Sequence, residues 1–118
     1  MMNHDPNLME SLDAMIAAPA YHSVLFENEQ VRVLDTRIAA GERTSIHTHR
    51  WPSVIYILNW SDFRRYDSNG QLVFDSLTMA SKPEIGSAIW NSAVGPHFVE
   101  NTGTAELRVI AVELKTAK

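Results

Sequence analysis

Three histidines have the residue type and spacing that could hold a metal ion. His47 and His49 stand two apart in a short stretch, Thr44 to His49, that is typical of a strand. Alternate side chains of a strand share one face, so both imidazoles can chelate the same ion. His97 lies far along the chain after Gly95-Pro96, where a closed barrel could bring it opposite the pair. The spacing of His47 and His49 alone is weak evidence, because surface or satisfied core histidines are the more frequent case.

Short strands are the elements that must position these histidines. Val54 to Leu58 is a nearly continuous apolar run, which indicates a buried strand, and Asn69-Gly70 is a strong hairpin signal. Further strands are predicted over residues 30–38, 44–49, 63–66, 71–74, 77–80, 87–90, 97–100 and 107–114. The pattern predicts an all-β sandwich or closed barrel.

One helix is predicted before the strands. Apolar residues recur at helical spacing between Asn7 and Ala18, and Pro19 would end the helix. We expect this helix to pack on the outside of the fold, with a dimerisation arm as the alternative. The expected organisation is an N-terminal helical segment over residues 1–22 and a single β-barrel domain over residues 23–118.

Glycines and an asparagine at fixed distances from the histidines add a second pattern. Gly41 stands six residues before His47, Gly86 stands eleven before His97, and Asn101 stands four after His97. On these residues the sequence resembles the cupin superfamily, whose motifs are G-x5-H-x-H-x3/4-E-x6-G and G-x5-P-x-G-x2-H-x3-N. The resemblance covers roughly the last three quarters of the chain. It implies a cupin double-stranded β-helix, a jelly-roll barrel that binds one divalent metal ion through the three histidines.

The glutamate ligand of the first cupin motif is missing. It should fall at Ser53 or Val54, and neither side chain is a carboxylate. Either the site has decayed and the barrel is only a scaffold, or three neutral histidines hold the ion alone, as in some cupin dioxygenases. We favour the second interpretation, because a decaying site has no reason to lose one ligand and keep the other three in register. Such an ion keeps its full positive charge and favours an anionic ligand.

Four residues near the histidines are candidate ligand contacts. If Val54 points at the ion, as the resemblance implies, strand parity places Tyr56 on the same face. The phenol of Tyr56 could then act in catalysis by orienting a substrate or donating a proton, the alternative being a buried tyrosine bonded to backbone. Trp51 follows the paired histidines and could rim the pocket, and Arg37 has either an anion-binding or a surface role. Substrate binding is therefore expected from Trp51, Val54 and Arg37.

The resemblance favours a metal-dependent enzyme that acts on a small anionic molecule. Our first interpretation is a mononuclear non-haem metal dioxygenase. Nitrogen ligands suit iron, nickel, zinc, copper or cobalt, of which iron is the first candidate. The alternative is a non-catalytic barrel that binds or senses a small ligand, with or without metal. A third possibility is sugar or keto-acid isomerisation with a non-redox ion.

Composition excludes several other classes of function. The formal net charge of −4 opposes binding to phosphate backbones, so no nucleic-acid partner is expected. The absence of cysteine excludes disulfides and thiolate metal sites. No apolar run approaches the ~18 residues that span a bilayer, and no secretory leader is evident. We expect a cytoplasmic protein without a membrane partner that forms a homodimer through sheet edges.

Overall fold

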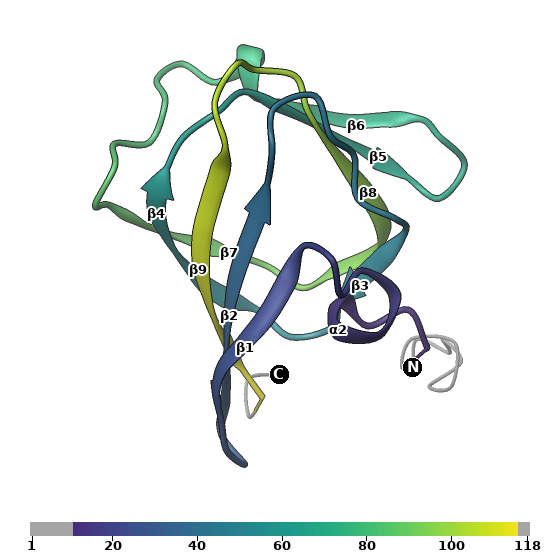
Figure 1. The fold of residues 1–118 in the computed structure, drawn as a ribbon, viewed down its shortest axis with the longest axis vertical. Coiled ribbons are helices and arrows are strands. Elements are labelled where there is room, and N and C mark those ends of the chain that lie inside the picture. Colours follow the sequence, from purple (N-terminus) through teal and green to yellow (C-terminus); the bar gives the residue numbers. More distant parts are fainter. Residues whose placement is uncertain (1–10, 116–118) are drawn as a thin grey trace.

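The structure is a computed structural model that describes residues 11–115. Two antiparallel sheets face each other and form a barrel, with the strand orders β1-β2-β9-β4-β7 and β3-β8-β5-β6 (Figure 1). The described elements are α2 (Ala14–Ala17), β1 (His22–Glu27), β2 (Val31–Ile38), β3 (His47–His49), β4 (Ser53–Asn59), β5 (Phe63–Asp67), β6 (Leu72–Asp75), the 3-10 helix η1 (Ser76–Thr78), β7 (Ala88–Asn91), β8 (Val94–Asn101) and β9 (Leu107–Leu114).

Alternation along the strands of the larger sheet places an aliphatic core inside the barrel. Leu34, Ile38, Ile57, Leu107 and Ala111 are buried, and they come from the neighbouring strands β2, β4 and β9. The register pairs Leu34 with Ala111 and Ile38 with Leu107, so these side chains form one layer. Burying each of the larger ones contributes about 1.5–3 kcal/mol. The same alternation turns every second residue of these strands outward.

The smaller sheet brings distant histidines together and contains the expected hairpin. In the pairing of β3 with β8, His47 lies opposite His97. β5 lies between β8 and β6, and residues 67–70 form the turn to β6. The Asp67 carboxylate accepts hydrogen bonds from the backbone N–H groups that follow, and Gly70 has a φ of 82°. This turn confirms the hairpin signal of Asn69-Gly70.

The segment before β1 packs beside β3 (Figure 1). Asp13 caps α2 by accepting a hydrogen bond from the Met15 N–H at 3.1 Å, and the Thr48 N–H donates to the Leu12 carbonyl at 2.6 Å. Of the helix expected between residues 7 and 18, the structure describes only one turn, and residues 7–10 lie outside the described residues. A single turn is unstable alone, so caps and packing hold it.

The prediction of a strand over residues 77–80 is wrong. Leu77 and Thr78 belong to η1 and Met79 caps its end, and the Asp75 carboxylate accepts a hydrogen bond from the Leu77 N–H at 3.0 Å. The Thr78 hydroxyl donates to the Asp75 carbonyl at 2.7 Å. Local side-chain bonds of this kind compete with strand pairing.

No helix within residues 11–115 is long and apolar enough to cross a membrane.

Candidate metal centre

Four histidines from three strands meet close to α2. His22 opens β1, His47 and His49 begin and end β3, and His97 lies on β8. One ring nitrogen from each of His22, His47 and His49 lies within 4.8 Å of the other two. The ring centroid of His97 is 4.4 Å from that of His47 and 5.5 Å from that of His49. The structure therefore brings the three sequence-predicted histidines together and adds His22 to them.

Three of these imidazoles donate their Nδ1 hydrogen to a backbone carbonyl oxygen. The pairs are His22 with Ala18 at 2.9 Å, His47 with Ser45 at 2.7 Å and His97 with Gly95 at 2.7 Å. Because a carbonyl oxygen only accepts, Nδ1 carries the hydrogen in each ring and Nε2 keeps its lone pair. This is the tautomer in which a histidine binds a metal ion through Nε2.

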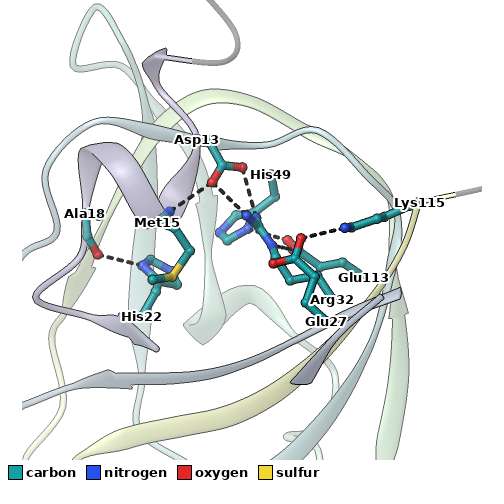
Figure 2. Close-up of polar contacts among 9 residues, drawn as sticks. All are labelled: Asp13, Met15, Ala18, His22, Glu27, Arg32, His49, Glu113 and Lys115. Carbon is teal, nitrogen blue, oxygen red and sulfur yellow. Dashed lines mark hydrogen bonds and ion pairs between the residues drawn. The ribbon is translucent and has the colours of Figure 1, made fainter. Parts of the chain in front are cut away.

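His49 is held in the same tautomer by a carboxylate. Its Nδ1 donates to Glu113 Oε2 at 3.1 Å, and Glu113 Oε1 accepts a hydrogen bond from Arg32 Nε at 2.7 Å. The guanidinium of Arg32 in turn donates to both carboxylate oxygens of Asp13 at 2.9 Å each. Figure 2 shows this chain of contacts running from the cap of α2 to the imidazole. The N-terminal segment is therefore connected directly to the histidine cluster.

Burial and ion pairing both shift the pKa values of the three charged side chains in this chain of contacts, Asp13, Arg32 and Glu113. Burial raises the pKa of Glu113, although the hydrogen bond from Arg32 opposes that shift. For Asp13 burial is also the largest single effect and acts upward, but the hydrogen bonds from Arg32 and the Met15 N–H together with the nearby arginine charges outweigh it and lower the pKa. Burial alone would lower the pKa of Arg32, and its bonds to the two carboxylates raise it instead. With both carboxylates ionised the trio carries one net negative charge, which favours a cation at the adjacent imidazoles.

All four clustered histidines are neutral at pH 7. Burial lowers the pKa to about 4 for His22 and His47, to about 3 for His49 and to about 2 for His97. The neutral imidazole is the form that binds a metal ion. The donor set thus fits a divalent transition ion in both charge and tautomer.

The histidines line a cavity of about 240 Å³ whose wall is formed by residues of both sheets. Most of its wall is aliphatic or aromatic, with Ile57, Phe63 and Phe74 among its members. Within residues 11–115 no aspartate or glutamate lines it. A cavity of this size and chemistry suits a small, mainly apolar molecule with few polar groups.

His22 is the member of the cluster that sequence reasoning missed. It has no second histidine at chelating distance in the chain. Its place inside the barrel follows from the pairing of β1 with β2, where it lies opposite the cavity residue Thr36. The sequence carries no local signal for that pairing.

The predicted orientation of β4 is wrong by one residue. Ser53, Ile55 and Ile57 line the cavity, whereas Val54 and Tyr56 lie on the outer face, 37% and 43% exposed. A shift of one residue along a strand reverses the face of every side chain. Tyr56 and Val54 are therefore not part of the cavity wall. Ser53 is the residue that stands inside at the position of the motif's glutamate.

The two remaining candidate contacts also lie away from the cavity. The Trp51 ring lies beneath the cationic ends of Arg32 and Arg50, at 5.0 and 4.4 Å from its centroid. Arg37 is largely exposed and pairs with Asp35 at 2.9 Å. Neither side chain is part of the cavity wall. For Arg37 the surface alternative is the one that the structure favours.

The other motif positions are structural. Gly41 and Gly86 have φ values of 79° and 87°, a region that side-chain-bearing residues rarely adopt. Asn101 is fully buried, and its amide donates to the carbonyls of Ile38 and Ala105 at 2.8 Å each. These residues shape the turns and close the barrel around the histidines.

Solved structures of cupins resemble this arrangement of strands. A cupin domain from Bordetella pertussis Tohama I matches with a TM-score of 0.65 and 22% identity, over 80% of this chain and 92% of that one. A double-stranded β-helix domain protein from Klebsiella pneumoniae matches with a TM-score of 0.54 and 15% identity, over 82% and 78% of the two chains. An RmlC-like cupin from Methanocaldococcus jannaschii gives 0.54 and 13%, over 79% of each chain. No family model and no curated protein matches the sequence.

The likeness defines the class of fold. The chain has the cupin fold, an all-β double-stranded β-helix with a short N-terminal helix. This confirms the fold that the two motifs implied. A fold of this kind hosts many chemistries, so function must be argued from the site.

Proposed function

We propose that this protein binds one divalent transition ion through the Nε2 atoms of its clustered imidazoles, with iron as the first candidate. The observation that carries the proposal is the convergence of ring nitrogens from His22, His47 and His49 within 4.8 Å. Each of these rings already has its Nδ1 bonded elsewhere. A nitrogen donor set also suits nickel, zinc, copper or cobalt. His97, whose ring centroid lies 4.4 Å from that of His47, is the further candidate donor.

Each part of the site has a distinct task in this proposal. When bound, the ion supplies Lewis acidity and, in the case of iron, redox chemistry. The imidazoles fix its position, and Glu113 holds the ring of His49 in the binding orientation. Apolar walls such as Ile57 and Phe63 exclude water from the cavity.

We further propose that the protein is an enzyme that oxidises a small anionic molecule with dioxygen. Neutral ligands leave the charge of the ion in place, which favours an anionic substrate. The volume of about 240 Å³ limits that substrate to a small molecule. In a dioxygenation both oxygen atoms enter the product and the substrate supplies the electrons, so no external reductant is required.

Metal analysis and oxygen uptake test this function together. Elemental analysis of the purified chain is expected to find close to one transition ion per chain, or uptake of one from added iron. Iron-loaded protein with a panel of small carboxylic acids and diketones is expected to consume dioxygen, and the zinc-loaded protein is the matched control that does not. A protein that takes up neither iron, nickel nor zinc contradicts the metal site.

A non-catalytic ligand-binding barrel is the second candidate. The observation in its favour is that no carboxylate within residues 11–115 lines the cavity and Tyr56 faces outward, so the histidines are the only conventional proton-transfer groups there. Saturable binding of a ligand that is recovered unchanged, without oxygen uptake on the iron-loaded protein, favours this candidate over the enzyme.

A further inference from the structure

Arg65 places a positive charge in the wall of the cavity. It lies on β5, where Phe63 and Arg65 line the cavity. Its cross-strand neighbours are Val99 on β8 and Phe74 on β6, and both of these also line the cavity. The guanidinium therefore enters an otherwise apolar part of the barrel.

Arg65 has no counter-charge in the described part of the chain. Its Nε is buried and has no hydrogen-bond partner, and no carboxylate lies at ion-pair distance from the guanidinium. Burial is the cause that lowers its pKa. Arg32 shows the contrast, because its buried guanidinium is paired with two carboxylates. An arginine stays protonated even so, and a buried unpaired cation destabilises a fold.

The position of Arg65 relative to the histidines sets the length of a bridging molecule. Val99, opposite Arg65, is two residues from His97 on the same face of β8. Arg65 and His97 are thus diagonal neighbours, separated by roughly 7–8 Å at the backbone. A molecule of a few bonds can contact the guanidinium at one end and face the histidine cluster at the other.

We propose that Arg65 binds the carboxylate of a small monocarboxylic acid whose apolar body fills the cavity. The planar guanidinium matches a carboxylate, and one cation balances one negative charge. The two wall residues directly opposite Arg65, Phe74 and Val99, offer no further side-chain donors for the additional oxygens of phosphate or sulfate. That the other end of the acid faces a metal ion rests on the proposed function, whereas the carboxylate site does not.

Calorimetric titration of the full-length chain tests this site. The probes are benzoate and hexanoate, with the uncharged benzamide and hexanamide and with inorganic phosphate as comparisons. Arg65→Gln is the test variant, and Arg64→Gln is the matched control, because Arg64 is the next residue, does not line the cavity and pairs with Asp75 at 3.1 Å. We expect Arg65→Gln to weaken binding of both acids at least about tenfold and Arg64→Gln to leave it within about twofold. The amides are expected to bind parent and variants alike, and phosphate not to bind.

Several outcomes overturn the carboxylate site. These are equal binding of the acids by parent and Arg65→Gln, equal binding of acid and amide by the parent, or no binding of either acid at millimolar concentration. Since Arg65→Gln removes an unpaired, partly buried charge, its melting temperature is expected to be no lower than the parent's. Loss of folding in both Arg65→Gln and Arg65→Met would assign Arg65 a structural role and also overturn the proposal.

Repeating the titrations after chelation separates this inference from the metal site. Binding that depends on Arg65 but persists in metal-free protein supports the carboxylate site even if no ion is ever bound. Normal metal content in Arg65→Gln, together with unchanged affinity for the acids, rejects the carboxylate site and leaves the metal site intact.

Discussion

At the scale of single residues, the cluster is organised by what each imidazole does with its Nδ1. The partner of His22 is the carbonyl of Ala18, the buried C-cap residue of α2 (Figure 2). His49 relies on Glu113, which is tied through Arg32 to Asp13 of the same segment. Rings fixed in this way lose little conformational entropy when a ligand binds. The N-terminal segment thus orients two of the candidate donors.

The first prediction concerns His22. We expect His22→Gln to lower the affinity for a divalent transition ion by about 100-fold or more, because one of the converging nitrogens is removed. Competition with a chromogenic chelator measures the change. Thr36→Val is the control, because Thr36 lies opposite His22 in the cavity wall and offers no nitrogen donor.

The result for His22 also decides between two ligand sets. Unchanged affinity in His22→Gln, together with a large loss in His97→Gln, would mean that the ion uses the sequence-predicted set of His47, His49 and His97. A large loss in both variants would indicate that all four imidazoles contribute.

The second prediction concerns the pH dependence of stability in metal-free protein. The pKa values of the clustered histidines are lowered from 6.5 to between about 2 and about 4 by burial. Below pH 6.5 the unfolded chain therefore binds protons that the folded chain does not, so the free energy of unfolding falls with pH. Each histidine contributes a slope of at most about 1.4 kcal/mol per pH unit, from below pH 6.5 down to about pH 4.

Urea unfolding in the presence of chelator, between pH 8 and pH 4, measures this dependence. The raised pKa of Glu113 has the opposite effect, because the folded chain then binds a proton more readily than the unfolded chain as the pH falls. This is a single group, whereas four histidines act in the other direction. In a His22→Gln variant the free energy of unfolding is expected to fall less steeply with decreasing pH, since one of the titrating groups is gone. A free energy of unfolding that stays constant between pH 7 and pH 5 contradicts the burial of neutral histidines.

At the scale of elements, β4 decides which residue can replace the missing glutamate. The third prediction is that Ser53→Glu makes stability depend on metal and that Val54→Glu does not. Ser53 faces the cavity and lies opposite Glu113, so a second carboxylate there destabilises the metal-free fold. Added manganese is expected to raise the melting temperature of Ser53→Glu by at least about 4 °C more than that of the parent.

Val54→Glu is the matched control for the register of β4. Its carboxylate replaces a side chain that is 37% exposed on the outer face, so the response to manganese is expected to equal that of the parent. If manganese instead raises the melting temperature of Val54→Glu and not that of Ser53→Glu, Val54 faces the cavity and the face that we assign to β4 is reversed.

The elements also explain how much the sequence could predict. The type of fold, the chelating spacing of His47 and His49 within one strand, and the turn at Gly70 depend on the spacing of apolar residues and on turn chemistry. A sequence displays both of these directly. The face of β4 was not predictable, because an apolar run such as residues 54–58 carries no alternation. His22 and Arg65 reach the cavity only through the pairing of β1 with β2 and of β5 with β8. Such pairings are properties of the tertiary fold.

At the scale of the whole molecule, an apolar row crosses the outer face of the larger sheet. The register links Phe26 to Val33, Val33 to Val112, Val112 to Val54 and Val54 to Trp90, so the row spans all five strands from β1 to β7. Phe26 is 54% exposed and Trp90 is 58% exposed. A continuous exposed apolar surface of this kind marks an interaction site.

The homodimer, the cytoplasmic location and the absence of nucleic-acid and membrane partners stay predictions.

The fourth prediction places the homodimer interface on this outer face, in place of the sheet edges expected from the sequence. Two copies related by a two-fold axis can bury the same row against itself, because an isologous contact needs only one self-complementary surface. At a strand spacing of about 4.8 Å the row is roughly 20 Å long, which is wide enough for the centre of a dimer interface. We expect the parent to sediment as a dimer at micromolar concentration. Trp90→Glu puts a charge into the row and is expected to weaken dimerisation at least about tenfold.

Leu77→Glu supplies the control for that variant. Leu77 is 63% exposed in η1 and is not part of the outer row, so the same apolar-to-acidic change there is expected to leave the dimer intact. Sedimentation velocity of the three proteins at equal concentration separates the possibilities. A monomeric parent rejects the homodimer, whereas a dimer that survives Trp90→Glu and dissociates in Leu77→Glu moves the interface to the end of the barrel near η1. Because the row faces away from the cavity, Trp90→Glu is also expected to keep its metal content, so any loss of metal in the monomer would show that assembly supports the site.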